Sequence, residues 1–469
     1  MSAPAIRRAP PPRLDIETDV VVIGAGAGGL TAALAAHDGG AEVVVVERDA
    51  SPSGSTSMSS GFIPAPGTNA QRAAGIADDT PARFEADIQA KAGHRAVDHL
   101  AHLAATEIGP ALDWLAEAHG LEWQVLTDFL YPGHSRHRMH AVPEKSGAAL
   151  LARLLTAVET ADIPVVTNAL ARTLYVDGDD RVTGVEIARP DGTTEILGCR
   201  ALILACNGYG GNPALVARHI PEMAEALYYG HAGNTGDALH WGEALGAESR
   251  HLTAYQGHGS LAHPHGVLIT WALMMEGGIQ VNRAGRRFSN EHGGYSEQAV
   301  KVLAQAGGIA WAIYDARRHA FAMEGFPDYR DAIEAGAIRS GADAEALATA
   351  TGLPAEALAR TLAEVAAYQA GTETDPFGRD YSGKPGLEAP FYAVKVTGAL
   401  FHTQGGLLID TNARVVKRSG TPFPNLHAVG GAACGVSGPE VSGYLSGNGL
   451  LTAVAFARVA GREAASTQN

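Results

Sequence analysis

Three glycines and one acidic residue near the N-terminus have the types and spacing of a phosphate-binding turn. Gly24, Gly26 and Gly29 follow the order G-x-G-x-x-G, and Glu47 lies about twenty residues further on. Gly24 permits a tight turn, Gly26 lets the backbone approach a pyrophosphate, and Gly29 allows a helix to pack closely on a strand. Glu47 can accept hydrogen bonds from a ribose diol. Together these residues predict a dinucleotide-binding site.

The elements that must hold these residues lie on both sides of the glycines. Residues 20–23 form an apolar, β-branched run with the length of a buried parallel strand, and residues 43–46 form a second one that ends on Glu47. The apolar segment 30–36 between them predicts a helix, whose N-terminal N–H groups would face the phosphates. This order of strand, turn, helix, strand and acid predicts a βαβ dinucleotide unit.

Other polar segments are candidates for contacts with the same ligand. Residues 51–68 are rich in Ser, Gly and Thr and follow the second strand directly. This position favours a loop that wraps the cofactor, and a plain surface loop is the alternative. Asn207-Gly208 ends a later apolar strand. Asp237 follows a Thr-Gly turn, where it can cap a helix or hold a cofactor hydroxyl.

The segment 129–141, FLYPGHSRHRMHA, gathers three histidines and two arginines. The arginines between the histidines would oppose a bound cation, so no metal site is predicted there. We expect a cationic loop near the substrate or the cofactor phosphate. A solvated surface loop is the alternative interpretation.

The order of the remaining segments predicts a large chain in two parts. Residues 164–208 change to short strands with Asp-Gly turns, which is typical of a β-meander that returns to the central sheet. Residues 298–370 are alanine-rich and are predicted to be helical. A strand is expected again over residues 391–396, and a glycine-rich loop that runs into an apolar helix is expected over residues 435–461.

Composition narrows the classes of function. The chain has 469 residues, of which 46% are hydrophobic, and its net charge of −15 argues against nucleic acid or an anionic membrane surface as a partner. Three scattered cysteines predict a reducing compartment, the cytoplasm. Residues 1–18 are predicted to be a disordered leader. No apolar stretch is long enough to predict a transmembrane helix.

Over residues 19–463 the chain resembles the fumarate reductase and 3-ketosteroid dehydrogenase family of flavoproteins. The resemblance rests on the glycine turn, the serine-rich loop, TGD at 235–237, GRRFSNE at 285–291, HTQGGLLID at 402–410 and YLSGNGL at 444–450. It implies an α/β fold, in which a Rossmann-like FAD-binding domain of parallel sheet and β-meander is interrupted by an α+β cap domain. The implied parts are the FAD-binding domain, 19–258 and 386–469, and the cap, 259–385.

The same resemblance implies FAD as the cofactor, and the absence of histidine from residues 51–68 predicts that it is held non-covalently. The predicted FAD-binding residues are Gly24, Gly26, Gly28, Gly29, Glu47, Arg48, Ser55, Thr56, Ser57, Ser60, Gly61, Asn207, Gly208, Asp237, Gly430, Gly431, Ser446, Gly447, Asn448 and Leu450.

The resemblance also identifies five candidate catalytic residues. Gln256-x-His258 and His402-Thr403 resemble the two histidine motifs of fumarate reductases. The places of the two arginines that bind the dicarboxylate in those enzymes are taken here by Tyr295 and Tyr444. Ketosteroid dehydrogenases have tyrosines at both places, and their third active-site tyrosine corresponds to Tyr131. Tyr295 and Tyr444 have ordinary packing as their alternative role, and His258 and His402 have that of structural core histidines.

The exchange of arginine for tyrosine has a chemical meaning. Arginine binds a carboxylate through two hydrogen bonds, whereas tyrosine offers one hydroxyl and an apolar ring. This predicts an FAD-dependent dehydrogenase that converts a cyclic ketone or 3-ketosteroid-like substrate to the α,β-unsaturated ketone. Tyr444 and a backbone N–H within residues 446–449 would bind the carbonyl oxygen. Tyr295 would remove the α-proton, with help from Tyr131 or His258 in lowering its pKa.

Two alternatives to the desaturase remain. In the first, the chain is an ene-reductase of the fumarate reductase type that acts on an enone or enoate, which the retained His258 and His402 favour. In the second, it is a flavin carrier without catalysis of its own. In the desaturase reaction the flavin takes up the β-hydride and an external electron acceptor must reoxidise it, because the sequence shows no haem, iron–sulfur or second nucleotide motif.

Overall fold

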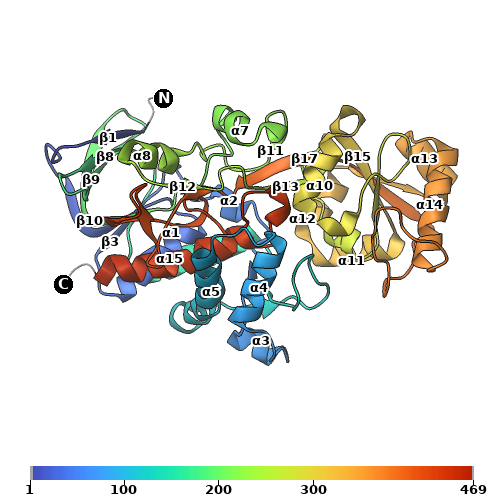
Figure 1. The fold of residues 1–469 in the computed structure, drawn as a ribbon, viewed down its shortest axis with the longest axis horizontal. Coiled ribbons are helices and arrows are strands. Elements are labelled where there is room, and N and C mark those ends of the chain that lie inside the picture. Colours follow the sequence, from blue (N-terminus) through green and yellow to red (C-terminus); the bar gives the residue numbers. More distant parts are fainter. Residues whose placement is uncertain (1–3, 467–469) are drawn as a thin grey trace.

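The computed structural model describes residues 4–466, which form two lobes (Figure 1). The larger lobe holds both ends of the described chain, and the smaller lobe holds the helices from α10 (Tyr295–Leu303) to α14 (Ala355–Gln369). Strand β17 (Phe391–Thr403) links the lobes, because its first half pairs with strands of the smaller lobe and Ala399 and Leu400, further along it, pair with β11 (Leu227–Tyr228).

A nine-stranded sheet forms the centre of the larger lobe. Strand β2 (Ile16–Ile23) lies between β3 (Val43–Val46) and β10 (Thr194–Leu204), and all three run parallel. The apolar ends of β2 and β3 are buried, as expected for strands covered on both faces. Helices α1 (Ala27–Asp38) and α15 (Asn448–Ser466) pack against each other. Their close approach requires small residues, since a Cβ at Gly461 would lie 2.3 Å from the Ala32 carbonyl oxygen.

The predicted β-meander is present, with β8 (Leu170–Val176), β9 (Val182–Ala188) and β10 in antiparallel order. The expectation of a disordered leader over residues 1–18 is wrong where the chain forms strands, at residues 5–7 and at residues 16–18, the start of β2. Ala5–Arg7 forms strand β1, which extends the sheet by pairing in parallel with β8. Residues 1–3 lie outside the described residues. A three-residue strand has too short a pattern to be recognised without its partner.

The smaller lobe is built on a second sheet. Strand β17 pairs with β13 (Tyr255–Ala262), β15 (Ile309–Asp315) and β16 (Ile338–Gly341). The prediction of helix throughout residues 298–370 is therefore wrong for β15 and β16. Every residue of β15 is buried, with Trp311 and Ile313 in one apolar cluster and Ala310, Ala312 and Tyr314 in another. Burial on both faces removes the polar alternation that would have marked a strand in an alanine-rich segment.

The remaining elements surround these two sheets. The helices are α2 (Gly54–Ser57), α3 (Asn69–Ala73), α4 (Pro81–Lys91), α5 (Asp98–His119), α6 (Gly147–Thr160), α7 (Pro213–His219), α8 (Asp237–Leu245), α9 (Ala272–Met275), α11 (Ala316–Gly325), α12 (Pro327–Glu334) and α13 (Ala344–Thr351). The strands are β4 (Ile63–Pro64), β5 (Gln124–Val125), β6 (Met139–Ala141), β7 (Val165–Val166), β12 (Ser249–Arg250), β14 (Ile279–Val281), β18 (Gly406–Leu407), β19 (Arg414–Val416) and β20 (Pro422–Ala428). Within residues 4–466, no helix has the length and apolar character needed to cross a membrane.

Candidate active site

The glycine turn has the geometry that its sequence predicts. Gly24 has φ +108°, and a Cβ there would lie 2.6 Å from the Ala205 carbonyl oxygen. A Cβ at Gly29 would lie 1.8 Å from the Gly24 carbonyl oxygen, so only glycine lets α1 start this close to β2. Gly29 therefore serves packing and does not line the cavity described below.

The acidic residue after β3 is held against this turn. One carboxylate oxygen of Glu47 accepts the Ala25 N–H at 3.0 Å and the other accepts the Asp49 N–H at 3.1 Å. The Thr56 hydroxyl accepts the Ala27 N–H at 3.0 Å. The serine-rich loop thus closes over the N-terminus of α1, where unpaired N–H groups and the helix dipole favour an anion.

One continuous cavity runs from this turn to the smaller lobe, and it brings together residues from distant parts of the sequence. Sixteen of the twenty predicted FAD-binding residues line it, and the four that do not are Gly29, Ser57, Gly208 and Asn448. All five predicted catalytic residues also line it, and they are Tyr131, His258, Tyr295, His402 and Tyr444.

Ser55 joins two asparagines on the wall of this cavity. The Ser55 hydroxyl accepts hydrogen bonds from Asn207 Nδ2 at 2.9 Å and from Asn234 Nδ2 at 3.1 Å. Asn207 has φ +64°, a left-handed conformation that asparagine tolerates better than most residues. Asp237 does not cap α8, because its carboxylate accepts the Thr235 hydroxyl at 2.8 Å and the N-cap residue Gly236 provides no side chain. Sequence reasoning missed Asn234, which stands just before the Thr-Gly turn.

Two tyrosines meet at the end of the cavity in the smaller lobe. The rings of Tyr295, the first residue of α10, and Tyr444 lie 6.0 Å apart, and their hydroxyls interact. The Tyr295 hydroxyl also interacts with the Ser446 side chain. The Tyr444 hydroxyl faces the backbone N–H groups of Gly447 and Gly449. Gly449 belongs to the first turn of α15, whose N–H groups have no partner within the helix.

Burial controls the ionisation of these phenols. It raises the pKa of Tyr295 to about 12, although the Ser446 and Tyr444 side chains act in the opposite direction. Burial and the neighbouring Tyr295 raise the pKa of Tyr444 well above its usual value, against the two backbone N–H groups. Burial, with a smaller effect of Tyr295, also raises the pKa of Tyr131. All three side chains are therefore neutral hydrogen-bond donors at neutral pH.

The two histidines flank the tyrosine pair. The ring of His258, on β13, stacks on Tyr295 at 4.8 Å, and its Nδ1 accepts the Ser260 N–H at 3.1 Å. The ring of His402, on β17, lies 5.7 Å from that of Tyr444. Burial lowers the pKa of His258 to about 3 and that of His402 to about 4, so both rings are neutral.

Hydrogen bonds also determine the tautomer of His402. The Ser437 hydroxyl donates to Gln404 Oε1 at 2.8 Å, so the Gln404 amide donates to His402 Nδ1 at 3.0 Å. His402 Nδ1 also lies 3.4 Å from the Thr403 carbonyl oxygen, but its contact with Gln404 is the shorter of the two, so the proton of the neutral ring is assigned to Nε2. A Cβ at position 449 would lie 2.8 Å from that Nε2, which explains why the chain has glycine there. Sequence reasoning missed Gln404, although it stands within the HTQGGLLID motif.

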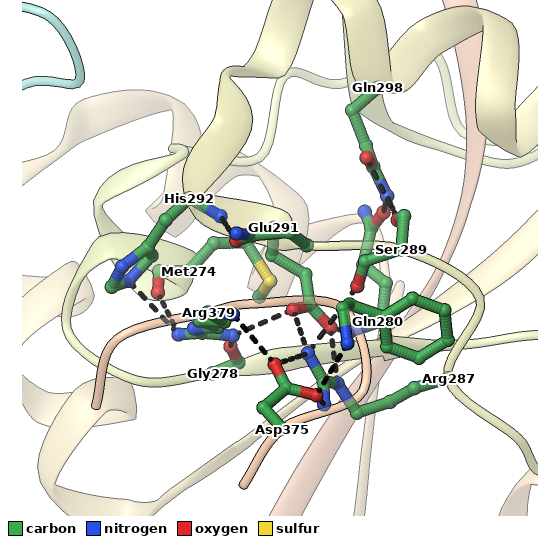
Figure 2. A network of polar contacts seen from close by, with 12 residues as sticks. Met274, Gly278, Gln280, Arg287, Ser289, Glu291, His292, Gln298, Asp375 and Arg379 are labelled. Atoms are coloured by element: carbon green, nitrogen blue, oxygen red, sulfur yellow. Dashed lines mark hydrogen bonds and ion pairs between the residues drawn. The ribbon is translucent and has the colours of Figure 1, made fainter.

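A buried cluster of ionic side chains supports the loop that precedes Tyr295 (Figure 2). Arg287 pairs with Glu291 at 2.7 Å and with Asp375 at 2.9 Å, and Arg379 pairs with Glu291 at 2.9 Å. Burial opposes ionisation of Glu291, but Arg379 and Arg287 outweigh it and hold the pKa of that carboxyl below its usual value. The GRRFSNE motif thus anchors the entry to α10.

Polar contacts hold α10 on its other sides. Gln298, one turn into α10, exchanges hydrogen bonds with Ser289 and donates to Gln280 Oε1 at 2.9 Å (Figure 2). Lys91, at the end of α4, pairs with Glu297 at 2.8 Å and donates to the Gly293 carbonyl oxygen at 3.0 Å. These contacts place the Tyr295 ring relative to both lobes.

The loop 129–141 is not the cationic substrate loop that its composition suggested. Arg136 pairs with Asp78 at 2.5 Å on the surface. Arg138 is fully buried and binds Asp79 through two hydrogen bonds. Burial lowers the pKa of His134 to about 3, in concert with Arg138. Carboxylates from residues 78–87 neutralise the arginines, and the sequence pattern of the loop alone could not show that pairing.

Charged side chains are unevenly distributed along the cavity lining. Arg48 and His231, beside Asp49 at the glycine turn, are the lining residues other than His258 and His402 that could carry positive charge in the part of the chain that is described. Near the tyrosines the lining combines large apolar side chains with uncharged polar ones such as Gln404 and Ser446, and Asp328 on α12 adds a carboxylate. Burial and the nearby Asp331 raise the pKa of Asp328.

The remaining candidate chemistry can be assigned to packing. Cys206 also lines the cavity, and burial raises the pKa of its thiol to about 12, so it is not a reactive thiolate. All three cysteines are free thiols. Residues 4–466 contain no group of three or more His, Cys, Asp or Glu side chains placed to hold a metal ion.

Comparison with known proteins identifies the family to which the chain is similar. The family model described as "FAD binding domain" matches residues 19–450. A probable fumarate reductase of Shewanella frigidimarina is 30% identical over 455 residues, which cover 96% of this chain and 75% of that protein.

Solved structures show the same fold. The open conformation of a flavocytochrome c3 fumarate reductase matches with a TM-score of 0.80 and 28% identity, over 97% of this chain and 79% of that one. A 3-ketosteroid-Δ4-(5α)-dehydrogenase from Rhodococcus jostii matches with a TM-score of 0.76 and 24% identity, over 97% of this chain and 98% of that one. At that identity the second match shows a shared fold.

Proposed function

This chain belongs to the FAD binding domain family and is an FAD-dependent oxidoreductase, and on that premise we propose that it desaturates an uncharged cyclic ketone. The product is the α,β-unsaturated ketone. The class of reaction, oxidoreduction at a carbon–carbon bond, is that of its relatives. The substrate class is argued from the residues of this chain.

The residues at the glycine turn suit FAD. Gly24, Gly26 and Gly28 leave backbone without side chains along the cavity at the N-terminus of α1, where a pyrophosphate would accept N–H groups. Glu47 lines the same end and can accept a ribose hydroxyl while it holds the turn. FAD supplies the acceptor for a hydride when bound, and the protein supplies orientation and proton chemistry.

The observation that carries the proposal is the absence of positive charge around the tyrosine pair. Within the described residues, the cavity near Tyr295 and Tyr444 is lined by no arginine or lysine, and the two histidines there are neutral. A dicarboxylate bound there would lose its charge partners, and an unpaired buried charge costs several kcal/mol, roughly 3–5. A neutral ketone needs only hydrogen-bond donors at one oxygen.

The same residues provide those donors. Tyr444 O–H, backed by the N–H groups of Gly447 and Gly449, can bind a carbonyl oxygen and stabilise the enolate that forms when the α-proton leaves. Tyr295, whose hydroxyl contacts that of Tyr444, is the base that removes the α-proton. His258 packs on the Tyr295 ring and presents its Nε2–H as a further donor.

A second candidate is the reverse reaction, reduction of an enone or enoate. The observation that favours it is the raised pKa of Tyr295, about 12, which keeps the phenol protonated and ready to donate at neutral pH. The relative from Shewanella is named a fumarate reductase. An enone satisfies the uncharged site better than an enoate, for the reason given above.

Anaerobic mixing of the FAD-loaded protein with a panel of substrates tests the proposal. The panel pairs cyclic ketones and 3-ketosteroids with succinate and with their unsaturated partners, and flavin absorbance reports the reaction. Bleaching of the oxidised flavin by a saturated ketone, but not by succinate, is the expected result. The proposal fails if no ketone bleaches the flavin while fumarate or another enoate reoxidises the reduced protein.

One variant and its matched control test the role of Tyr444 in flavin bleaching. Tyr444→Phe removes an oxyanion donor and should slow bleaching by roughly 10²–10³, with the ring retained. Tyr392→Phe is the matched control, because Tyr392 stacks on Tyr314 and His319 in the smaller lobe and does not line the cavity. Equal rates in both variants would contradict the role of Tyr444.

A further inference from the structure

His134 is a buried histidine that the proposed reaction does not use, although it touches the loop that carries Tyr444. It is 6% exposed, and its Nε2 lies 3.0 Å from the carbonyl oxygen of Ser446. A carbonyl oxygen can only accept, so Nε2 carries the proton and donates it to this bond.

Two charged side chains, Arg138 and Asp79, hold the His134 ring with its proton on Nε2. Arg138 lies 3.4 Å from His134 Nδ1, which must accept from the guanidinium because arginine has no lone pair to offer. Asp79 in turn binds Arg138 at 2.9 and 2.7 Å. The Phe84 ring stacks on the His134 ring at 6.1 Å and lies beneath the Arg138 guanidinium at 4.6 Å. The tautomer and the orientation of His134 are therefore both set.

The Ser446 carbonyl belongs to the same peptide group as the Gly447 N–H. A trans peptide is planar, and its C=O and N–H point in opposite directions. When His134 binds the carbonyl on one side, the N–H is directed to the other side, where the Tyr444 hydroxyl lies. Gly447 has φ +87°, and a Cβ there would lie 2.5 Å from Pro64. Any residue with a side chain at position 447 would therefore strain the backbone.

We propose that His134 is a positioning residue, which holds the Ser446–Gly447 peptide so that the Gly447 N–H supports the Tyr444 hydroxyl. The proposal rests on the role of Tyr444 in the proposed function. It gives the histidine and arginine segment 129–141 a purpose that is neither metal binding nor phosphate binding. Asp79 orients Arg138, Arg138 orients the His134 ring, and His134 orients the peptide whose N–H faces the Tyr444 hydroxyl. No proton is transferred between these residues.

The test compares two amide substitutions of equal polarity. His134→Gln places an amide N–H near the position of Nε2 and can still donate to Ser446. His134→Asn is shorter, places its amide near the position of Nδ1, and loses that bond. His140→Asn is the matched control, because His140 is fully buried in the same segment but its ring hydrogen bonds go to the Thr68 hydroxyl at 2.7 Å and to the Arg138 carbonyl oxygen at 2.9 Å.

Two readouts are taken on each FAD-loaded variant. The first is the rate of flavin bleaching by the ketone that bleaches the wild type. It should fall roughly tenfold in His134→Asn, less than the 10²–10³ of an oxyanion donor removed outright, while KM stays unchanged. The second is the Tyr444 resonance of protein labelled with ¹³C at the tyrosine Cζ atoms, identified by its loss in Tyr444→Phe. Its shift reports hydrogen bonding at the phenol oxygen without any substrate.

The results for the three variants together test whether His134 positions the Ser446–Gly447 peptide. A shifted resonance and slow bleaching in His134→Asn, with wild-type behaviour in His134→Gln and His140→Asn, support the proposal. An unshifted resonance in His134→Asn overturns it, as does an equal shift in His140→Asn. If no ketone bleaches the wild-type flavin, the proposed function fails separately, and the resonance still decides the role of His134.

Discussion

The ionisation state of Tyr295 predicts different pH dependences for the rates of desaturation and of reduction. With a pKa of about 12, the Tyr295 phenol is ionised at pH 7 in about one molecule in 10⁵, and forming the phenolate costs about 7 kcal/mol at 1.36 kcal/mol per pH unit. If Tyr295 is the base, the reactive fraction rises about tenfold with each pH unit below that pKa. If it is the acid, it is fully protonated from pH 6 to 9.

The assay is anaerobic stopped-flow measurement of flavin bleaching by a saturated ketone over pH 6 to 9. We expect the rate constant to rise by about a factor of ten per pH unit, until the pH reaches the pKa of Tyr295 in the complex. Reoxidation of the reduced protein by the matching enone should be independent of pH over the same range. Tyr295→Phe retains the ring that packs on His258 and should lose the pH-dependent rate.

Tyr444→Phe is the control for this profile. It should lower the bleaching rate by roughly 10²–10³ at every pH and leave the slope unchanged, because it removes carbonyl binding and leaves the base. A bleaching rate that is flat from pH 6 to 9 refutes the assignment of Tyr295 as the base. A Tyr295→Phe protein with the wild-type profile refutes it as well.

Three further substitutions test the structure around the site. Glu291→Gln leaves Arg287 with Asp375 alone and takes from the buried Arg379 guanidinium the carboxylate it pairs with, so the free energy of unfolding should fall by about 3–5 kcal/mol in denaturant titration, and an unchanged midpoint would contradict the importance of the cluster. Asp328→Asn removes a carboxylate from the cavity wall and should raise kcat/KM for a carboxylated ketone about tenfold relative to a neutral one, whereas Glu334→Gln, exposed at the end of the same helix and outside the wall, should leave that ratio unchanged. Gly29→Ala places a Cβ 1.8 Å from a backbone oxygen and should abolish FAD retention on gel filtration, while Gly178→Ala, with no heavy atom within 4 Å, should retain it.

The sequence predicted well those structural elements that short local patterns determine. The strand of β-branched residues, the glycine turn and the acid at Glu47 are contiguous, and each has a local physical reason. The two Asp-Gly hairpins of the β-meander were predicted on the same basis, and both are present.

Predictions failed where the partner lies far away in the sequence. Strand β15 is covered by two apolar clusters, so its own residues show no alternation. Arg138 looked like free positive charge because its partner Asp79 is fifty-nine residues earlier. Strand β1 forms only because β8 offers it an open edge. Charge neutralisation and strand pairing are properties of the folded chain, and a window of sequence cannot display them.

By itself the sequence determined the chemical types that meet in the cavity: a glycine turn that suits FAD, tyrosines, and two histidines. Only the tertiary structure decided their state and their contacts. Tyr295 comes from α10 in the smaller lobe and Tyr444 from the loop before α15 in the larger one, so their hydroxyls meet only when the lobes pack together. Burial at that junction makes the histidines neutral and the phenols protonated, because a charged group there would give up its hydration without gaining a partner.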